Sequence, residues 1–192
     1  MLYIPVILGS IRRNRESIKV ANFAVSTLKT RSGVGTDLLD LKELNLPMME
    51  ERLRFEHDPP PGVSAFSSKI NQADSIVIVA PEYNGGYPGV LKNALDYLKN
   101  EYKRKPVGII TVSVADTGGI LCLVSLRQML LHLGGVPIPA PLLATRVQEL
   151  FDSDGRPSDQ RFAKHANIFF DELLWLTEAL ATQRKKEPGI VT

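Results

Sequence analysis

Short apolar runs alternate along the chain with longer stretches in which apolar residues recur at helical spacing. The short runs have the length of strands buried on both faces of a parallel sheet and cover residues 2–8, 35–41, 75–80, 106–112 and 136–141. The helical periodicity covers residues 17–30, 63–72, 88–98, 120–133 and 158–182. This alternation predicts an α/β protein with one parallel sheet, helices on both of its faces and right-handed crossovers.

The length of 192 residues, 44% of them hydrophobic, is enough for one sizeable core and short for two. We therefore expect a single domain over residues 1–182, with a long irregular connection at 45–61 and a frayed tail at 183–192. The helix at 120–133 is apolar almost all round, which predicts burial on more than one side. A symmetric interface that also uses residues 88–98 would supply the second side, and cover by the carboxy-terminal helix is the alternative.

Charge and reactive residues exclude several classes of function. The formal net charge of +2 does not favour nucleic acid or an anionic membrane as a partner, and no apolar stretch approaches the ~20 residues of a membrane helix. The single Cys122 cannot form an internal disulfide and indicates a reducing compartment. Since the first residues also lack the marks of a signal peptide, we expect a cytoplasmic protein. The three histidines, His57, His132 and His165, lack metal-ligand spacing, so no metal site is expected.

Ligands of open parallel sheets bind at the carboxyl ends of the strands, which directs attention to three loops. The first loop reads GSIRRNRES from Gly9 to Ser17 and combines a Gly-Ser turn, three arginines and a hydroxyl at a helix start. Arginine forks, hydroxyls and the N–H groups of a helix amino terminus all donate to phosphate oxygens. The loop therefore predicts a phosphate site, although a capped helix behind a solvated basic turn remains the alternative.

The second loop reads PEYNGGYPG from Pro81 to Gly89 and follows the run with the highest β-branched content. Its glycines allow backbone amides to approach a flat ring, and a flavin ring has carbonyl oxygens and nitrogens that need such donors. The alternative is an ordinary tight turn built from Asn-Gly and Pro-Gly chemistry. So many special residues at the end of a buried strand favour ring binding.

These two segments, with the SVADTGG loop after the fourth strand, resemble the NADPH-dependent FMN reductase family. The PEYNGGYPGVLKNALDYL segment is similar to the signature segment of that family, and GSIRRNRES to its G-S-x-R phosphate loop. The resemblance implies a flavodoxin-like three-layer sandwich with a five-stranded parallel sheet in the order 2-1-3-4-5. It also implies tightly held FMN, hydride delivery from NADPH or NADH, and assembly as a homodimer or homotetramer.

The resemblance also assigns cofactor-binding residues by position. Those that match the phosphate positions are Ser10, Arg12, Arg15 and Ser17. Those that match the ring-binding positions are Pro81, Glu82, Tyr83, Asn84 and Gly85. The third loop departs from the simpler family pattern at Ala115 and Asp116, and its assigned residues are Ser113, Thr117 and Gly118.

The expected activity is a two-step transfer of a hydride from the nicotinamide to bound FMN and then to a small acceptor, such as a quinone, a flavin, an azo compound or a metal anion. The flavin carries the hydride chemistry, so no catalytic side chain is predicted, and Glu82 is expected to hold its loop. A flavodoxin-type electron carrier is the rival, although its Ser/Thr-rich phosphate loop and acidic charge contrast with the arginine loop and the pI near 8.7 found here. A flavin-free regulatory domain is a third interpretation.

Overall fold

A central parallel sheet carries the fold in the computed structural model, which describes residues 1–186. The main sheet has the order β4-β2-β5-β6-β7, and β8 also pairs with β6. Its strands are β2 (Val6–Leu8), β4 (Leu38–Asp40), β5 (Ile76–Pro81), β6 (Pro106–Val112), β7 (Val136–Pro137) and β8 (Leu142–Ala144). A smaller parallel pair, β1 (Leu2–Tyr3) with β3 (Val34–Gly35), precedes β2 and β4 along the same two paths of the chain.

Three of the five predicted strands are each divided in two, so their number and bounds differ from the prediction. Pro5 follows β1, and Pro137, Pro139 and Pro141 surround the break between β7 and β8. Proline has no N–H to donate and therefore interrupts a hydrogen-bonded ladder. When the two pieces of each divided strand are taken together, the paths run in the order 2-1-3-4-5, and the flavodoxin-like class is confirmed.

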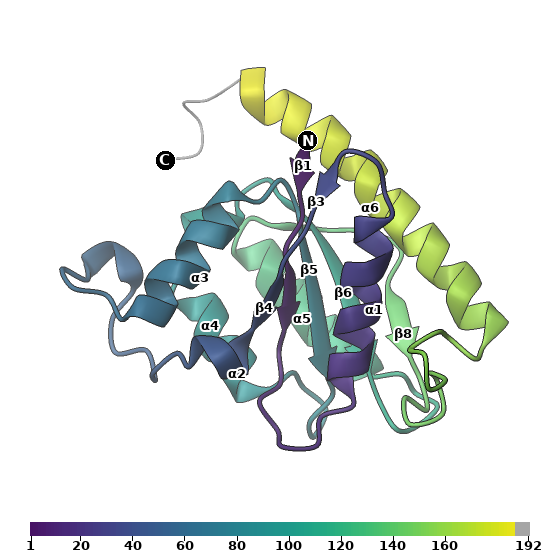
Figure 1. Ribbon diagram of the computed structural model, residues 1–192. Coiled ribbons are helices and arrows are strands. Elements are labelled where there is room, and N and C mark those ends of the chain that lie inside the picture. The colour runs from purple at the N-terminus through teal and green to yellow at the C-terminus, as the bar shows by residue number, and fades with distance from the viewer. Residues whose placement is uncertain (187–192) are drawn as a thin grey trace.

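Helices cover both faces of the sheet (Figure 1). On one face lie α1 (Ser17–Lys29) and the long α6 (Gln160–Lys186). The other face is covered by α3 (Pro61–Gln72), α4 (Gly89–Asp96) and α5 (Ile120–His132). The short elements α2 (Leu41–Leu44), η1 (Leu53–Phe55) and η2 (Asn100–Tyr102) lie in the connections.

Each face of the sheet has its own apolar core, as the alternation of side chains along β5 shows. Ile76 and Ile78 pack with α3, α4 and α5, whereas Val77 and Val79 pack with α1 and α6. All four are at most 1% exposed, and full burial of such a side chain contributes about 1.5–3 kcal/mol. Because both sides of the strand are dry, its sequence is continuously apolar rather than alternating.

The carboxy-terminal helix extends further than its periodicity predicted. It ends at Lys186, so residues 183–186 belong to α6 and not to a frayed tail, while residues 187–192 lie outside the described part of the chain. Arg184 explains the extension, because its guanidinium donates to the backbone carbonyl oxygens of Arg104 (2.6 Å) and Asp74 (2.8 Å). The last turn is thereby tied to the loops at the amino edge of the sheet.

Within residues 1–186, no helix combines the length and the apolar character needed to cross a bilayer.

Candidate functional site

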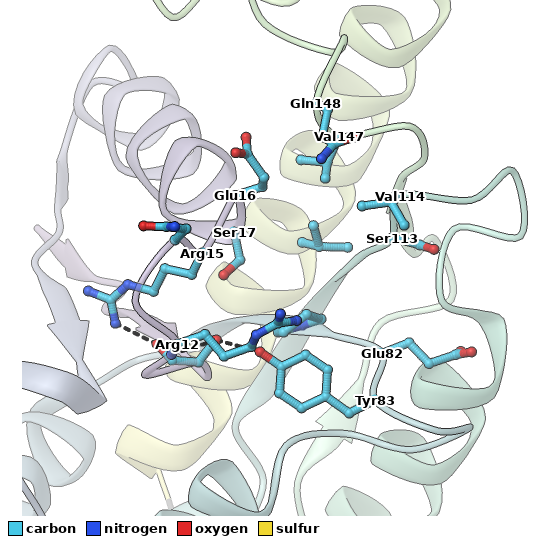
Figure 2. Close-up of a pocket in the computed structure, with 14 residues that line it drawn as sticks. Arg12, Arg15, Glu16, Ser17, Glu82, Tyr83, Ser113, Val114, Val147 and Gln148 are labelled. Atoms are coloured by element: carbon cyan, nitrogen blue, oxygen red, sulfur yellow. Dashed lines mark hydrogen bonds between the residues drawn. The ribbon is translucent and has the colours of Figure 1, made fainter.

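A cavity of about 320 Å³ opens at the carboxyl ends of β2, β5 and β6, where the three selected loops meet (Figure 2). Eight of the twelve expected cofactor residues line it, and these are Ser10, Arg12, Arg15, Ser17, Pro81, Glu82, Tyr83 and Ser113. The other four, which do not line it, are Asn84, Gly85, Thr117 and Gly118. The topology alone brings the three loops together, because parallel strands end at the same edge.

The first loop leaves β2 through Gly9, at a point where the chain is too crowded for a side chain. A Cβ at Gly9 would lie 2.8 Å from Leu91 Cδ2 and 3.2 Å from the carbonyl oxygen of Val79. This close approach places Ser10 in a fully buried position beside the second loop. The Ser10 hydroxyl lies 2.8 Å from the Tyr83 hydroxyl, so the first and second loops are joined by a hydrogen bond.

The amino terminus of α1 presents donors to the cavity. Ser17, the first residue of α1, is 2% exposed, and its hydroxyl has no hydrogen-bond partner among the described residues. Likewise, no side chain of the described part of the chain caps this helix at Glu16. Leaving a buried hydroxyl unpartnered costs about 1–3 kcal/mol. An anion at this helix terminus would satisfy the hydroxyl and benefit from the positive end of the helix dipole.

The two arginines that line the cavity have different surroundings. Arg12 is exposed, and its guanidinium carbon lies 5.5 Å from the centre of the Tyr83 ring. Arg15 points away from Tyr83 in Figure 2 and forms a bidentate ion pair with Asp40 at the end of β4. Its Nη1 also donates to the Ser10 carbonyl oxygen. Arg15 therefore lines the cavity with its guanidinium paired to a carboxylate of the protein.

The second loop divides into a lining part and a tight turn. Tyr83 and Gly86 exchange backbone hydrogen bonds of 2.8 and 3.1 Å, and the two residues between them, Asn84 and Gly85, have φ values of 51° and 78°. Two consecutive positive φ values are the geometry for which Asn-Gly is favoured. Asn84 and Gly85 thus form a tight turn, while Pro81, Glu82 and Tyr83 line the cavity.

Glu82 holds its loop, as predicted. Its carboxylate accepts from the backbone N–H groups of Leu121 (3.0 Å) and Cys122 (3.1 Å) in the first turn of α5. Carboxylates at a helix amino terminus satisfy free N–H groups and complement the helix dipole. Burial, assisted by this nearby carboxylate, raises the pKa of the Cys122 thiol to about 12, so Cys122 is a neutral buried thiol.

The third loop contributes Ser113 and Val114 to the cavity but turns away after them. Ser113 accepts the N–H of Ala115 at 3.0 Å. Gly118 has a φ of 63°, and its carbonyl oxygen accepts the Thr111 hydroxyl at 2.6 Å. A Cβ at Gly118 would lie 2.8 Å from Leu143 Cβ, so this glycine is required by the course of the loop.

Sequence reasoning missed six residues that line the cavity, namely Asn14, Glu16, Val112, Val114, Val147 and Gln148. Val147 and Gln148 are the informative ones, because they follow the fifth strand path, after β8. The backbone N–H of Val147 donates to the Ser113 carbonyl oxygen at 3.1 Å and so joins this segment to the third loop. The rule that pointed to the other loops applies to every strand of a parallel sheet and would have found this one as well.

The fold and the cavity define a class, an α/β protein of flavodoxin-like fold in which the start of α1 shares a cavity with an aromatic, glycine-containing loop. Comparison with known proteins identifies the family within that class. The family model for NADPH-dependent FMN reductase matches residues 2–149, and the chain belongs to this family. It is an FMN-dependent oxidoreductase that transfers reducing equivalents from NAD(P)H through FMN to an acceptor.

Several relatives support this assignment. The chain is 34% identical over 145 residues to a quinone reductase of Escherichia coli K12, an alignment that covers 73% of this chain and 75% of the relative. It is 35% identical over 130 residues to an NAD(P)H-dependent FMN reductase of Schizosaccharomyces pombe, covering 66% of this chain and 64% of that protein. The solved structure of the flavoenzyme NAD(P)H:(acceptor) oxidoreductase FerB of Paracoccus denitrificans matches with a TM-score of 0.76 and 26% identity, over 93% and 98% of the two chains.

Proposed function

We propose that Ser10, Arg12 and Ser17 bind the phosphate of FMN. The observation that carries this proposal is the buried Ser17 hydroxyl, which lines the cavity at the start of α1 and lacks a partner among the described residues. A phosphate oxygen is an acceptor that suits it, and Arg12 supplies a positive charge from the rim of the same cavity. The residues present therefore fit the phosphate end of FMN.

For the ring, we propose Pro81, Glu82, Tyr83, Asn84 and Gly85, together with Ser113, Thr117 and Gly118. Pro81 to Tyr83 and Ser113 line the cavity, whereas the remaining four follow these lining residues in the second and third loops. Asn84 and Gly85 form a tight turn with little side-chain bulk, so the face of the ring beside this turn would stay open. An open face is required for a nicotinamide to approach within about 3–3.5 Å of the flavin.

FMN, when bound, supplies the two-electron chemistry that accepts a hydride from NAD(P)H and passes it to the acceptor. The protein binds and orients the two partners in turn at one open face, and Glu82 serves by holding its loop on α5. We propose quinones as the acceptor class, because a flat acceptor can occupy the same face as the nicotinamide. The names of relatives, among them the quinone reductase of Escherichia coli and a 2-hydroxy-1,4-benzoquinone reductase of Burkholderia, support this choice.

Anaerobic mixing of the FMN-loaded protein with NADPH tests the activity. The flavin absorbance should disappear in one two-electron step, and a benzoquinone should restore it. If NADPH and NADH both leave the flavin oxidised while a one-electron donor reduces it stepwise, the electron-carrier interpretation replaces the reductase. A purified protein that neither contains nor binds flavin would favour the regulatory domain.

We further propose a homodimer that uses the outer face of α5. Its exposed apolar residues are Ile120, Leu121, Val124 and Leu131, which are 44–64% exposed. The alternative cover, α6, packs on the opposite face of the sheet. Val124→Lys should therefore convert the dimer into a monomer in light scattering, because it would bury a charge in the interface. A wild-type protein that is already monomeric at micromolar concentration would contradict this proposal, and a tetramer would require a second surface.

A cytoplasmic location is part of the same proposal. A buried neutral thiol at Cys122 suits a reducing compartment. The net charge of +2 supports a nicotinamide nucleotide and a small acceptor as partners, in preference to nucleic acid or a membrane surface.

A further inference from the structure

The ion pair between Arg15 and Asp40 is the most strongly built polar contact beside the cavity. Arg15 Nη1 donates to Asp40 Oδ1 at 2.8 Å, Nη2 donates to Oδ2, and Nη1 also donates to the Ser10 carbonyl oxygen. Both side chains are only 11% exposed. A bidentate, partly buried Arg–carboxylate pair is directional and is little screened by solvent, unlike an ion pair on the surface.

Asp40 is itself held in place by the backbone around it. It ends β4, directly opposite Leu8 in the parallel register with β2. Its Oδ1 also accepts the N–H of Lys42 at 2.9 Å and thereby caps α2. The carboxylate is therefore a fixed point, since a strand end and a helix start both determine its position.

The hydrogen bond from Arg15 to the Ser10 carbonyl oxygen fixes the orientation of the Ser10 peptide beside the cavity. In a trans peptide, the C=O of one residue and the N–H of the next point in opposite directions. Holding the Ser10 carbonyl toward Arg15 therefore turns the following N–H, that of Ile11, away from Arg15. The Ser10 hydroxyl meanwhile shares a hydrogen bond with the Tyr83 hydroxyl. Figure 2 shows that the Arg15 guanidinium points away from Tyr83.

We propose that Asp40 and Arg15 are positioning residues for the FMN phosphate, and that Arg15 acts by orienting Ser10 rather than by binding the phosphate. This inference rests on the proposed flavin site. It leaves Arg12 as the arginine that supplies charge to the phosphate, and it adds the second strand path, through Asp40, to the elements that build the site.

The substitution Asp40→Asn separates the two possible roles of Arg15 by the sign of its effect. Asparagine is as good a helix cap as aspartate, so α2 keeps its start while the ion pair is lost. If Arg15 orients Ser10, FMN affinity should fall roughly tenfold or more, as expected for a lost charge-assisted contact. If Arg15 instead binds phosphate in competition with Asp40, removal of the carboxylate charge should free it and tighten FMN, and this outcome would overturn the inference.

Riboflavin, which lacks the phosphate, provides a readout that a general loss of structure would not reproduce. In Asp40→Asn and in Arg15→Lys, which keeps the charge but loses the fork, FMN affinity should fall while riboflavin affinity changes less than about twofold. The double variant should be no weaker than the more affected single variant, because residues of one network are not additive. Equal losses for FMN and riboflavin would assign the pair a merely structural role and refute the proposal.

The pair Arg31–Asp171 offers a matched control, since it joins the turn after α1 to α6, and neither residue lines the cavity. Asp171→Asn should leave the affinities for both flavins unchanged. Titration of the wild-type apoprotein with FMN distinguishes a failure of the proposed flavin site from a failure of the positioning role. A wild type that binds no FMN refutes the proposed function, whereas a wild type that binds FMN beside an Asp40→Asn variant of equal affinity refutes only the positioning role.

Discussion

Two cavities lie at opposite ends of the strands, one at the carboxyl edge of the sheet and one at the amino edge, and basic side chains line both. Only the cavity at the carboxyl edge has the properties of an anion site. At the carboxyl edge, Arg12 and the unpartnered Ser17 hydroxyl line a cavity of about 320 Å³. At the amino edge, Lys103, Lys105 and Arg184 line one of about 370 Å³. Neither the number of cations nor the size of the hollow distinguishes the two edges.

The difference lies in what the backbone offers at each edge. Lys105 donates to the carbonyl oxygens of Ile70 (2.6 Å) and Asn71 (2.9 Å) at the carboxy-terminal end of α3, so its amine is already engaged. Ser17 instead begins α1, where the backbone offers N–H groups. In a parallel α/β fold, helices begin at the carboxyl edge and end at the amino edge, so the dipole ends favour anions at the first and cations at the second. A basic cluster therefore indicates a site only where the protein does not supply its own acceptors.

The largest expected effect is the pH dependence of the free energy of unfolding that Lys105 causes at the amino edge. Burial lowers the pKa of Lys105 from 10.5 to about 8, so between these values the unfolded chain binds more protons than the folded one. Stability then rises with pH across this window. Relative to a Lys105→Met variant, the free energy of unfolding of the wild type should gain on the order of 3 kcal/mol from pH 8 to pH 10.5. Urea unfolding at several pH values measures this gain. If the free energies of unfolding of the wild type and the variant change equally with pH, the lowered pKa of Lys105 is contradicted.

At the carboxyl edge, Arg12→Ala should weaken FMN binding by about 1.5–3 kcal/mol, because the phosphate loses a charged donor. Isothermal titration of the apoprotein with FMN measures the change. Arg13→Ala is the matched control, since Arg13 belongs to the same loop but does not line the cavity. Equal losses in the two variants would mean that only the overall charge of the loop matters.

Ser17→Ala should have opposite effects on the apoprotein and on the complex. Removal of a buried hydroxyl that lacks a partner among the described residues should leave the stability of the apoprotein unchanged or raise it, whereas FMN affinity should fall by about 1 kcal/mol. Thermal unfolding with and without FMN tests both effects, and Ser26→Ala, an exposed position on the same helix, is the control. A lower stability of the apoprotein would mean that the hydroxyl has a partner within the protein.

The smallest effect should come from the third loop, where Asp116 forms an ion pair of 3.2 Å with Arg146, a residue that follows β8. Their side chains are 64% and 83% exposed, and such surface pairs contribute at most about 1 kcal/mol. Arg146→Ala should therefore change both FMN affinity and the free energy of unfolding by less than about 0.5 kcal/mol. A larger loss of FMN affinity would show that a charge outside the cavity also contributes to FMN binding, and that the effect of Arg12 does not depend on its place in the cavity lining.

The comparison also explains which parts of the site were predictable. The loops that carry Ser10, Ser17, Tyr83 and Ser113 could be selected because each follows a strand whose apolar run is evident, and parallel strands bring such loops together. The family resemblance then assigned these residues within the loops. Val147 was missed because prolines divide the strand before it and obscure its end. The ion pair of Arg15 could not be foreseen for a different reason, since its partner Asp40 lies 25 residues away in the chain.

The sequence by itself determined the order of elements, the three-layer class and the loops that build the site, because periodicity and turn chemistry are local properties. Tertiary structure alone decided which donors remain available to a ligand. In the sequence, Arg12, Arg15 and Lys105 are all cationic residues, but Asp40 binds Arg15 and the last turn of α3 binds Lys105 once the chain is folded. Whether a cationic side chain is free to bind a ligand depends on contacts between segments that are distant in the sequence. The sequence around the residue does not reveal these contacts.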